Sequence, residues 1–211
     1  MLQYDKSKYV HKGSRIGCLF CMQKEVIYLN KVEPIRDKQV INDIAEYLKN
    51  DNERNYVMFM MGIYSSLRVS DVLKLRVRDV RKLDYVKIKE KKTGKDKRFP
   101  INSELKKILK PYIEGKEDYE LLVPNPNHPE KPITRQQAYN IINKAARHFG
   151  LDNIGTHTMR KTFGYHMYKM THDAALIMDI LNHCSIDYTL RYIGINQDTK
   201  DKAYNKLSFR V

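Results

Sequence analysis

Apolar residues recur at helical spacing through most of the chain after Val32. Asp37 is predicted to cap the first helix, because an aspartate side chain accepts hydrogen bonds from the unpaired N–H groups of a first helical turn. One face of that helix is apolar and contains Val40, Ile41, Ile44, Ala45 and Leu48. Residues 56–64 are apolar almost throughout, which predicts a buried helix at the centre of the core. A third helix is expected to begin near Ser70 and to continue through Val72, Leu73 and Leu75.

The spacing then changes to that of a β-hairpin. Val86 and Ile88 alternate with lysines, and the alternation resumes from Arg98 to Ile101. Residues 92–95 lie between the two stretches and include Gly94, which can adopt the left-handed backbone of a tight turn without steric cost. The pattern therefore predicts two antiparallel strands joined by a turn at this glycine.

Helical spacing returns after the hairpin. Ser103 is expected to cap a helix whose apolar face contains Leu105, Ile108, Leu109 and Tyr112. Residues 124–132 contain four prolines and are predicted to form a loop. Thr134 and Gln137 have the spacing of a capping box, which predicts a helix that ends at Gly150. Further helices are expected over residues 158–170, over residues 173–181 and from Ser185 onward.

These elements predict a mostly α-helical fold with one small antiparallel β-sheet or hairpin. Residues 32–211 are expected to form one domain, since a chain of 211 residues most often makes a single one. Residues 1–31 lack a clear period and are predicted to be an N-terminal extension, partly disordered. Cys18 and Cys21 form a CxxC pair there, but one such pair provides too few ligands for a zinc site, so no metal site is expected.

The charge of the chain points to a polyanionic partner. Lysine and arginine number 39 against 25 acidic residues, which gives a formal net charge of +14. Such a balance suits nucleic acid or an anionic membrane surface. No apolar run approaches the ~20 residues of a membrane-spanning helix, and no signal-peptide pattern is present. The odd count of three cysteines argues against a disulfide framework and favours a reducing cytosol. Nucleic acid is therefore the expected partner.

Four segments carry the residue types that cleave a phosphodiester through a side-chain nucleophile. That reaction needs fixed cations around the phosphate, a nucleophile, a base that deprotonates it and an acid that protonates the leaving oxygen. Arginine suits the first task because its planar guanidinium contacts two oxygens and keeps its charge. The four segments contribute, in order, Arg68 with Asp71 three positions later, Lys92 in the hairpin turn, His157 with Arg160, and His183 with Tyr192 nine positions later.

In these segments and in their order, the chain from Val32 onward resembles the catalytic domain of the tyrosine recombinases of the phage integrase family. The resemblance implies that Arg68 and Arg160 bind the scissile phosphate. It also implies that Tyr192 attacks this phosphate and forms a 3′-phosphotyrosyl bond, which leaves a free 5′ hydroxyl. Because the covalent bond conserves the energy of the phosphodiester, rejoining to another strand would need no ATP.

The resemblance assigns the proton transfers to three further residues. His157 would hydrogen-bond the phosphate or accept the tyrosine proton, His183 would donate to a non-bridging oxygen, and Lys92 would protonate the 5′ leaving oxygen. Asp71 stands where the family commonly has glutamate and would support the neighbouring groups. Asn182 replaces the usual glycine before His183, and asparagine tolerates a left-handed backbone better than most residues. No metal ion and no other cofactor would be required.

For the whole protein, the resemblance implies a role in site-specific recombination or integration of a mobile element. The expected location is the bacterial cytoplasm, at the nucleoid. The partner would be double-stranded DNA, on which several protomers assemble into a homo-oligomer. The family's N-terminal helical domain, which closes around the far face of the DNA, is not recognisable before Val32. An accessory protein or a separate core-binding domain is therefore expected. Basic residues predicted to contact DNA are Arg76, Arg78, Lys91, Lys95, Lys144 and Arg147.

Each of these residues also has an ordinary structural interpretation. Lys92 belongs to a lysine-rich stretch that extends to Lys97 and reads equally as a solvated basic hairpin. His157 alone reads as a helix cap, and His183 beside Cys184 as a core pair or half of a metal site. Tyr188 precedes Tyr192 by one helical turn and is a second candidate nucleophile.

Two other functions remain open at this point. One is a basic DNA-binding remnant of a mobile element without catalytic activity. The other is a stand-alone relaxing enzyme, because type IB topoisomerases share the same mechanism. Only the remnant would bind DNA without forming a covalent adduct.

Overall fold

The structure is a computed structural model that describes residues 32–92 and 94–208. The predicted N-terminal extension and its two cysteines lie outside the described residues. The helices are α1 Lys38–Asp51, α2 Glu53–Ser65, α3 Val69–Val72, α4 Ser103–Tyr112, α5 Arg135–His148, α6 Thr158–Thr171, α7 Ala174–Ile180, α8 Ile186–Tyr192 and α9 Ile195–Lys206. The strands are β1 Tyr85–Lys89, β2 Asp96–Pro100, β3 Pro124–Asn125 and β4 His128–Pro132, and a 3₁₀ turn covers Val77–Asp79. None of the described helices is long and apolar enough to cross a membrane.

The larger of two hydrophobic cores is built around α2. Its side chains Val57, Met58, Phe59 and Met61 are fully buried, which confirms the central buried helix. Helix α1 packs on α2 through its predicted apolar face, and Asp37 caps it by accepting a hydrogen bond from the Gln39 amide at 2.7 Å. Both predictions follow from spacing alone, because local capping and an apolar stripe are enough to specify a surface helix.

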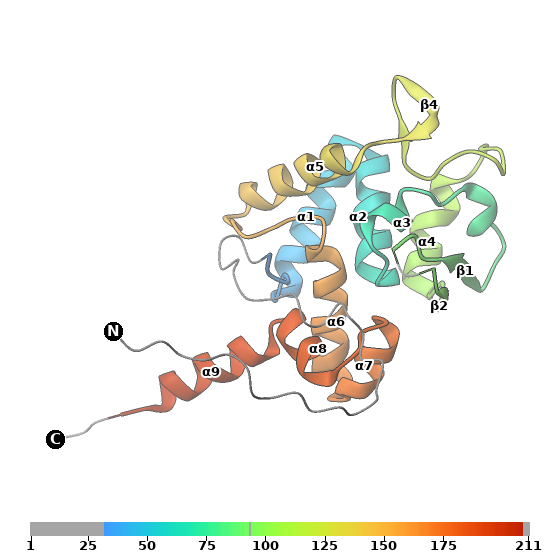
Figure 1. Cartoon of the computed structure of the whole chain (residues 1–211). Helices are drawn as coiled ribbons and strands as arrows, with labels where there is room; N and C mark the ends of the chain where they lie inside the picture. Colours follow the sequence, from blue (N-terminus) through green and yellow to red (C-terminus); the bar gives the residue numbers. More distant parts are fainter. Residues whose placement is uncertain (1–31, 93, 209–211) are drawn as a thin grey trace, which may run out of the picture.

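Helix α6 connects this core to a smaller one. Figure 1 shows α6 running from the upper helices down to the group formed by α7, α8 and α9. Met159 near its start is buried in the larger core, whereas Tyr165 belongs to the smaller core with Ile177, Leu181 and Ile193. A Cβ atom on Gly164 would lie 2.7 Å from Cγ2 of Ile193. The glycine therefore lets the residue that follows Tyr192 approach the α6 backbone directly.

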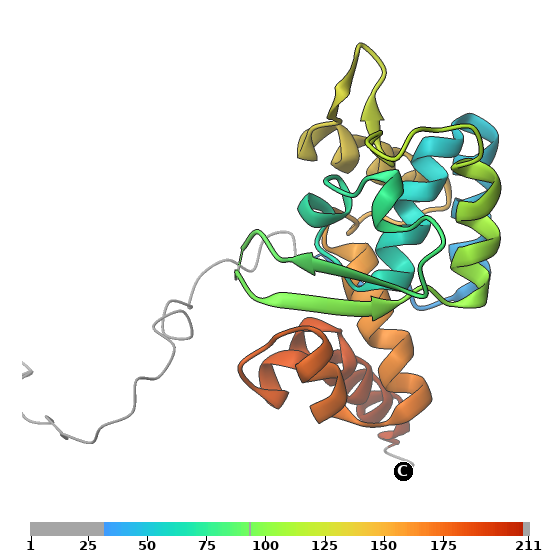
Figure 2. The ribbon, with the colours of Figure 1, turned by 90° about the vertical axis from the view of Figure 1, so that its right-hand side faces the viewer.

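Strands β1 and β2 form the predicted antiparallel hairpin, with Val86 opposite Phe99. Both of these side chains are buried, and Gly94 in the turn has a φ of 66°. Figure 2 shows the hairpin projecting sideways between the upper body and the lower group of helices. The hairpin thus extends from the larger core toward the level of α7 and α8.

The structure differs from the sequence predictions at three places. Helix α3 ends at Val72, and Leu75 lies in the following bend, where its carbonyl accepts a hydrogen bond from Leu122 at 2.9 Å. The cap of α4 is Asn102 rather than Ser103, because the asparagine side chain accepts from the Leu105 amide. Asparagine and serine cap equally well, so local preference could not separate the two neighbours.

The third difference is the proline-rich segment, which was predicted to be a loop. Residues 124–132 instead form a second hairpin, in which β3 and β4 pair antiparallel. The Asn127 amide donates to the Asn125 side chain at 3.0 Å and closes the turn. Prolines are tolerated because in a two-stranded ribbon each strand has an unpaired edge.

Candidate active site

Arg68 and Arg160 come together from the starts of two different helices. Arg68 immediately precedes α3, and Arg160 lies in the first turn of α6 with 1% of its surface exposed. The Arg160 guanidinium donates to the carbonyls of Ser66, at 2.6 Å, and of Leu181. Ser66 has a left-handed backbone, with a φ of 57°. Arg160 therefore connects the α2–α3 bend to the end of α7.

A buried carboxylate lies against both arginines. Oε2 of Glu90 is 2.9 Å from Nη1 of Arg68, and Oε1 is 3.6 Å from Nη1 of Arg160. The Glu90 side chain has no solvent exposure. Sequence analysis did not single out Glu90, which is one of two acids, with Asp96, in the lysine-rich residues 87–97.

Asp71 supports the hairpin turn that carries Lys92. Its side chain is buried, with 2% exposure for the residue, and Oδ1 accepts a hydrogen bond from the Lys91 amide at 3.0 Å. Lys92, one residue further along, is exposed on this turn. Asp71 thus holds the base of the turn, while the lysine extends from it.

Tyr192 lies at the end of α8 with its hydroxyl beside His157 and Arg160. Nδ1 of His157 is 3.4 Å from the hydroxyl oxygen, and Arg160 hydrogen-bonds the same hydroxyl. His157 precedes α6 but makes no side-chain capping hydrogen bond, so the simple helix-cap interpretation is wrong. Burial raises the pKa of Tyr192 to about 12, against the opposing effect of Arg160 and Arg68. The tyrosine therefore needs a base and a nearby cation to react.

His183 lies in the turn before α8. Asn182 has a φ of 49°, the left-handed conformation expected of the residue that replaces glycine. The His183 ring packs edge-on against Tyr188 and Tyr192, with ring centroids 4.9 and 4.8 Å apart. Burial, with Arg160 and Arg68 adding to the effect, lowers the pKa of His183 to about 3. Burial likewise lowers the pKa of His157 to about 4, so both rings are neutral near pH 7.

The hydrogen bonds around Thr189 assign the tautomer of His183. The Thr189 hydroxyl donates to the Ser185 carbonyl at 2.8 Å, and its oxygen lies 3.2 Å from Nδ1 of His183. A hydroxyl has one proton, so Nδ1 must be the donor in this second contact. In the neutral ring Nε2 then carries no proton, and it can donate only after the imidazole gains a second one.

Tyr188 lies next to Tyr192, with ring centroids 6.1 Å apart and an interplanar angle of 28°. Its ring also contacts His183. The two tyrosines therefore share one wall of the site, but the contact with Nδ1 of His157 belongs to Tyr192.

Lys97 corrects the view of the hairpin as a uniformly solvated basic stretch. Its exposure is 7%, and its ammonium donates to Ser66 Oγ and, at 2.9 Å, to the Ile180 carbonyl. Burial first, and then Arg160, lower the pKa of Lys97 to about 7. Its inward direction follows from the two-residue period of a strand, because Lys97 and Phe99 lie on the same face of β2.

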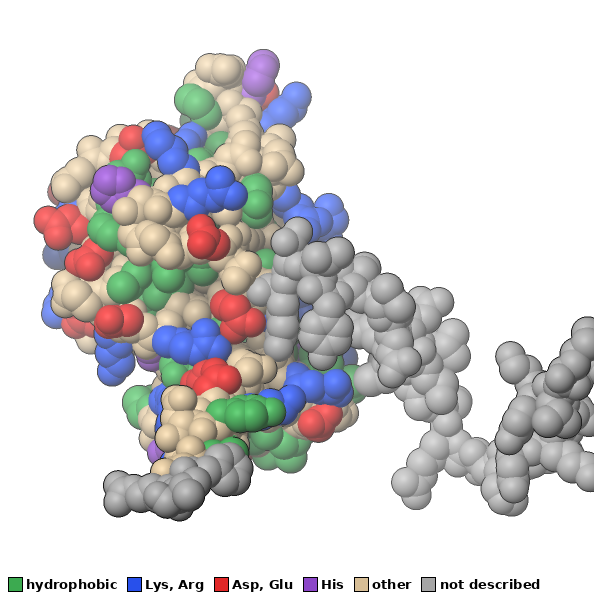
Figure 3. Space-filling view, turned by 90° about the vertical axis from the view of Figure 1, so that its left-hand side faces the viewer, with side chains coloured by type: hydrophobic (Ala, Val, Ile, Leu, Met, Phe, Trp, Pro, Cys, Tyr) green, Lys and Arg blue, Asp and Glu red, His purple; other side chains and the backbone are tan. Residues whose placement is uncertain are grey.

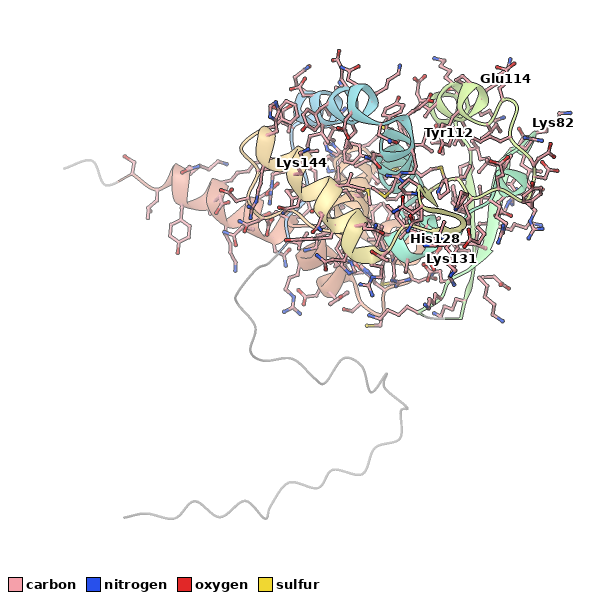
Figure 4. All side chains as sticks on the ribbon, turned by 90° about the horizontal axis from the view of Figure 1, so that it is seen from above. Lys82, Tyr112, Glu114, His128, Lys131 and Lys144 are labelled. Carbon is pink, nitrogen blue, oxygen red and sulfur yellow. The ribbon has the colours of Figure 1, made fainter. Side chains whose placement is uncertain are left out.

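The predicted DNA-contacting residues are mostly accessible. Arg78, Lys91, Lys95, Lys144 and Arg147 are exposed, and in Figure 4 Lys144 lies on the part of α5 near α1. Arg76 is half-buried, and its guanidinium donates to the Tyr119 carbonyl. The side of the molecule shown in Figure 3 mixes acidic and basic side chains, so the excess positive charge does not form a uniform patch there. In the described ranges, no group of three His, Cys, Asp or Glu side chains is placed to hold a metal ion.

Comparison with known proteins is consistent with this geometry. Residues 35–198 match the family model described as "Phage integrase family". The chain is 45% identical over 173 residues to "Probable integrase/recombinase YoeC" of Bacillus subtilis, which covers 82% of this chain and 95% of that protein. It is 29% identical over 195 residues to a "Tyrosine recombinase" of Pseudothermotoga lettingae, covering 84% of this chain and 66% of that one.

A solved structure shares the fold. The XerH site-specific recombinase, in a post-cleavage complex with its palindromic difH substrate, superimposes with a TM-score of 0.61 at 19% identity. The match covers 84% of this chain and 54% of the XerH chain, so this chain spans about half of that recombinase. The chain belongs to the phage integrase family and is a tyrosine recombinase.

Proposed function

We propose that this chain cleaves and rejoins DNA through Tyr192 in the site-specific recombination or integration of a mobile element. The observation that carries the proposal is the position of the Tyr192 hydroxyl, 3.4 Å from Nδ1 of His157 and hydrogen-bonded to Arg160. A base and a cation therefore meet at the one oxygen that must attack phosphorus. The DNA-bound structure of the lambda integrase, which shares the fold, supports DNA as the partner, and we take this DNA to be double-stranded.

The proposed reaction is a pair of transesterifications. His157 accepts the Tyr192 proton, and the phenolate oxygen forms a bond to phosphorus while the bond to the 5′ oxygen breaks. Lys92 gives a proton to that oxygen, which leaves as a 5′ hydroxyl. Attack by a 5′ hydroxyl of another strand reverses each step and releases the tyrosine. Arg68 and Arg160 stabilise the extra negative charge of the transition state.

Replacement of Tyr192 with phenylalanine is expected to abolish covalent DNA attachment, because it removes the attacking oxygen. Tyr188→Phe is the matched control on the same helix and should retain cleavage. The measurement is formation of a protein–DNA adduct on a nicked suicide substrate that carries the element's own ends, resolved on a denaturing gel. An adduct in Tyr192→Phe would exclude Tyr192 as the nucleophile, and loss of the adduct only in Tyr188→Phe would assign the nucleophile to Tyr188.

The same assay separates the alternative functions. DNA binding without an adduct in the wild-type chain would favour an inactive remnant. An adduct and plasmid relaxation on DNA of arbitrary sequence would favour a type IB topoisomerase-like activity. The similarity to integrases and recombinases supports neither alternative.

Lys92 is proposed as the acid, with Lys97 in a separate role. Lys97 holds Ser66 and the end of α7 from a buried position, whereas Lys92 lies on the exposed turn. Lys92→Ala is expected to slow cleavage by about 10²- to 10⁴-fold, the usual effect of losing a general acid.

A sulfur atom in place of the bridging 5′ oxygen should restore the Lys92→Ala rate, because a thiol, with a pKa of about 8.5, leaves without help from an acid. Single-turnover cleavage of the oxygen and sulfur substrates provides the measurement. Lys95→Ala is the control on the same hairpin. If the sulfur substrate restores the cleavage rate of Lys97→Met and not that of Lys92→Ala, the general acid is Lys97.

His183 is proposed to donate Nε2–H to a non-bridging oxygen. The tautomer derived above requires a doubly protonated ring for this, and a phosphate beside the ring favours that form by its negative charge. The ring is thus neutral in the free protein and gains a proton when DNA binds.

In the free protein, the neutral ring has a consequence for stability. The folded pKa of His183 is about 3 and the reference value is 6.5, so between these values the unfolded chain binds more protons. The free energy of unfolding should be at its full value above pH 6.5 and fall as the pH drops below it. Urea denaturation at pH 7.5, 6 and 5 should show a weaker pH dependence in His183→Asn. An unchanged dependence would contradict a neutral His183.

Oligomerisation on DNA is the remaining part of the proposal. Helix α9 extends away from the body in Figure 1, with Tyr204 and Leu207 exposed at 76% and 61%. We assign its far end to a neighbouring protomer. The acceptor would be the groove between α2, β2 and α6, which is lined in part by Tyr64, Phe163 and Met170.

Changing both Tyr204 and Leu207 to alanine should reduce the assembly of protomers on DNA, because it removes the apolar surface that would be buried. Lys202→Ala, also exposed on α9, is the matched control. Gel filtration of the DNA-bound protein gives the readout. Monomers alone in the wild type, unchanged in the double variant, would rule out this contact.

The proposal also covers the extent of the catalytic domain and the cellular compartment. Residues 32–211 are assigned to the catalytic domain. An accessory protein or a core-binding domain is expected to bind the far face of the DNA. Similarity to a Bacillus subtilis recombinase supports a bacterial cytoplasmic setting. Association with the nucleoid would follow from a chromosomal substrate.

A further inference from the structure

Glu90 contacts three parts of the active site at once. Its carboxylate forms ion pairs with Arg68 and Arg160, and Oε2 also accepts a hydrogen bond from the Asn182 side chain at 3.3 Å. Asn182 immediately precedes His183 in the turn before α8. One side chain of the hairpin thus joins both arginines to the segment that leads to the nucleophile.

The main chain of Glu90 begins the turn that carries Lys92. Its amide donates to the Lys95 carbonyl at 2.9 Å, and its carbonyl accepts from the Gly94 amide at 2.9 Å. Asp71 holds the next residue, Lys91, by its amide. The position of the Lys92 turn is therefore set at the same residue that contacts the arginines.

The carboxylate lies beneath the arginines, away from solvent. The Arg68 side chain keeps 14% of its surface exposed, whereas the Glu90 side chain has none. A phosphate that approaches from solvent would reach the exposed part of Arg68, whereas Glu90 contacts its buried Nη1 atom. Glu90 could either support the arginines or occupy the phosphate position until DNA binds. Its buried position beneath Arg68 favours the role of a support.

The two arginines need such a support. Like charges repel strongly where water is excluded, and a buried charge without a partner is costly. Arg160 has the Ser66 and Leu181 carbonyls as further partners, whereas the ion pair with Glu90 is the salt bridge that holds Arg68 among the described residues. Loss of the carboxylate should therefore displace Arg68 more than Arg160.

We propose that Glu90 is a positioning residue of the strand-cleavage reaction. It holds the guanidinium groups of Arg68 and Arg160 where both can contact one phosphate, and it aligns the Lys92 turn and the Asn182–His183 turn with them. The inference rests on the proposed function, because it concerns how the same site is assembled. Glu90 itself does not touch the DNA.

The test compares Glu90→Ala and Glu90→Gln in single-turnover cleavage of the suicide substrate at saturating DNA. Glu90→Ala should slow cleavage by about 10²-fold, as removal of an oriented charge-stabilising group does, with the Kd for DNA nearly unchanged. Glu90→Gln should lie between Glu90→Ala and wild type, because its amide oxygen keeps a partial negative charge beside Arg68 but loses the full charge of the ion pair. Glu104→Gln, an exposed acid on α4, is the matched control.

A second substrate distinguishes positioning from a general loss of structure. A methylphosphonate at the scissile position removes one negative charge, so cleavage depends less on the arginines. The defect of Glu90→Ala should shrink on this substrate, as should that of Arg68→Ala. An equal defect on both substrates would assign Glu90 a merely structural role and overturn the proposal.

Two further outcomes are decisive. Faster cleavage by Glu90→Gln than by wild type would mean that the carboxylate competes with phosphate, which also overturns the proposal. If Glu90→Ala does not fold, as judged by thermal unfolding, the nearly isosteric Glu90→Gln carries the two-substrate comparison. Absence of an adduct in the wild type would refute the proposed function, whereas a wild-type adduct with fully active Glu90 variants would refute only this inference.

Discussion

Burial of Arg160 is the constraint on which the rest of the site depends. A guanidinium with 1% exposure requires partners for its N–H groups, and it finds them in the carbonyls of Ser66 and Leu181 and the carboxylate of Glu90. These partners come from the α2–α3 bend, the end of α7 and the hairpin. Satisfying one buried charge therefore brings three distant segments together, and Lys97 bridges two of them again through Ser66 and Ile180.

Helix α6 transmits this arrangement to the nucleophile. Its first turn provides Arg160 to the larger core, and its later turns pack against the smaller core that includes Ile193. Since Gly164 lets Ile193 approach the helix closely, the end of α8 is held against the same helix that carries the phosphate-binding arginine. The distance from Tyr192 to Arg160 is thus set by packing along one rigid element.

Local signals were enough to predict where the helices and the first hairpin lie, because caps and apolar stripes act over a few residues. They did not predict the end of α3 at Val72 or the cap of α4 at Asn102. The same signals missed the β3–β4 hairpin, where the Asn125 turn overrides the usual effect of proline. Sequence spacing also brought Arg68, Arg160, His183 and Tyr192 into one hypothesis, and the fold places them together. Glu90 and Lys97 were not recognised in this way, because their importance comes from burial against residues distant in the chain, 31 positions away for Lys97 and Ser66 and 92 for Glu90 and Asn182.

The electrostatics of the free site favour its neutral forms. Burial raises the pKa of Tyr192 to about 12 and lowers those of His183 and His157 to about 3 and 4. In the free site the Tyr192 phenol and both imidazoles are therefore uncharged near pH 7. A bound phosphate adds negative charge beside both histidines, which makes their protonated forms more favourable. His157 can then accept the tyrosine proton and His183 can donate to the phosphate, so the substrate itself supplies the charge that activates the site.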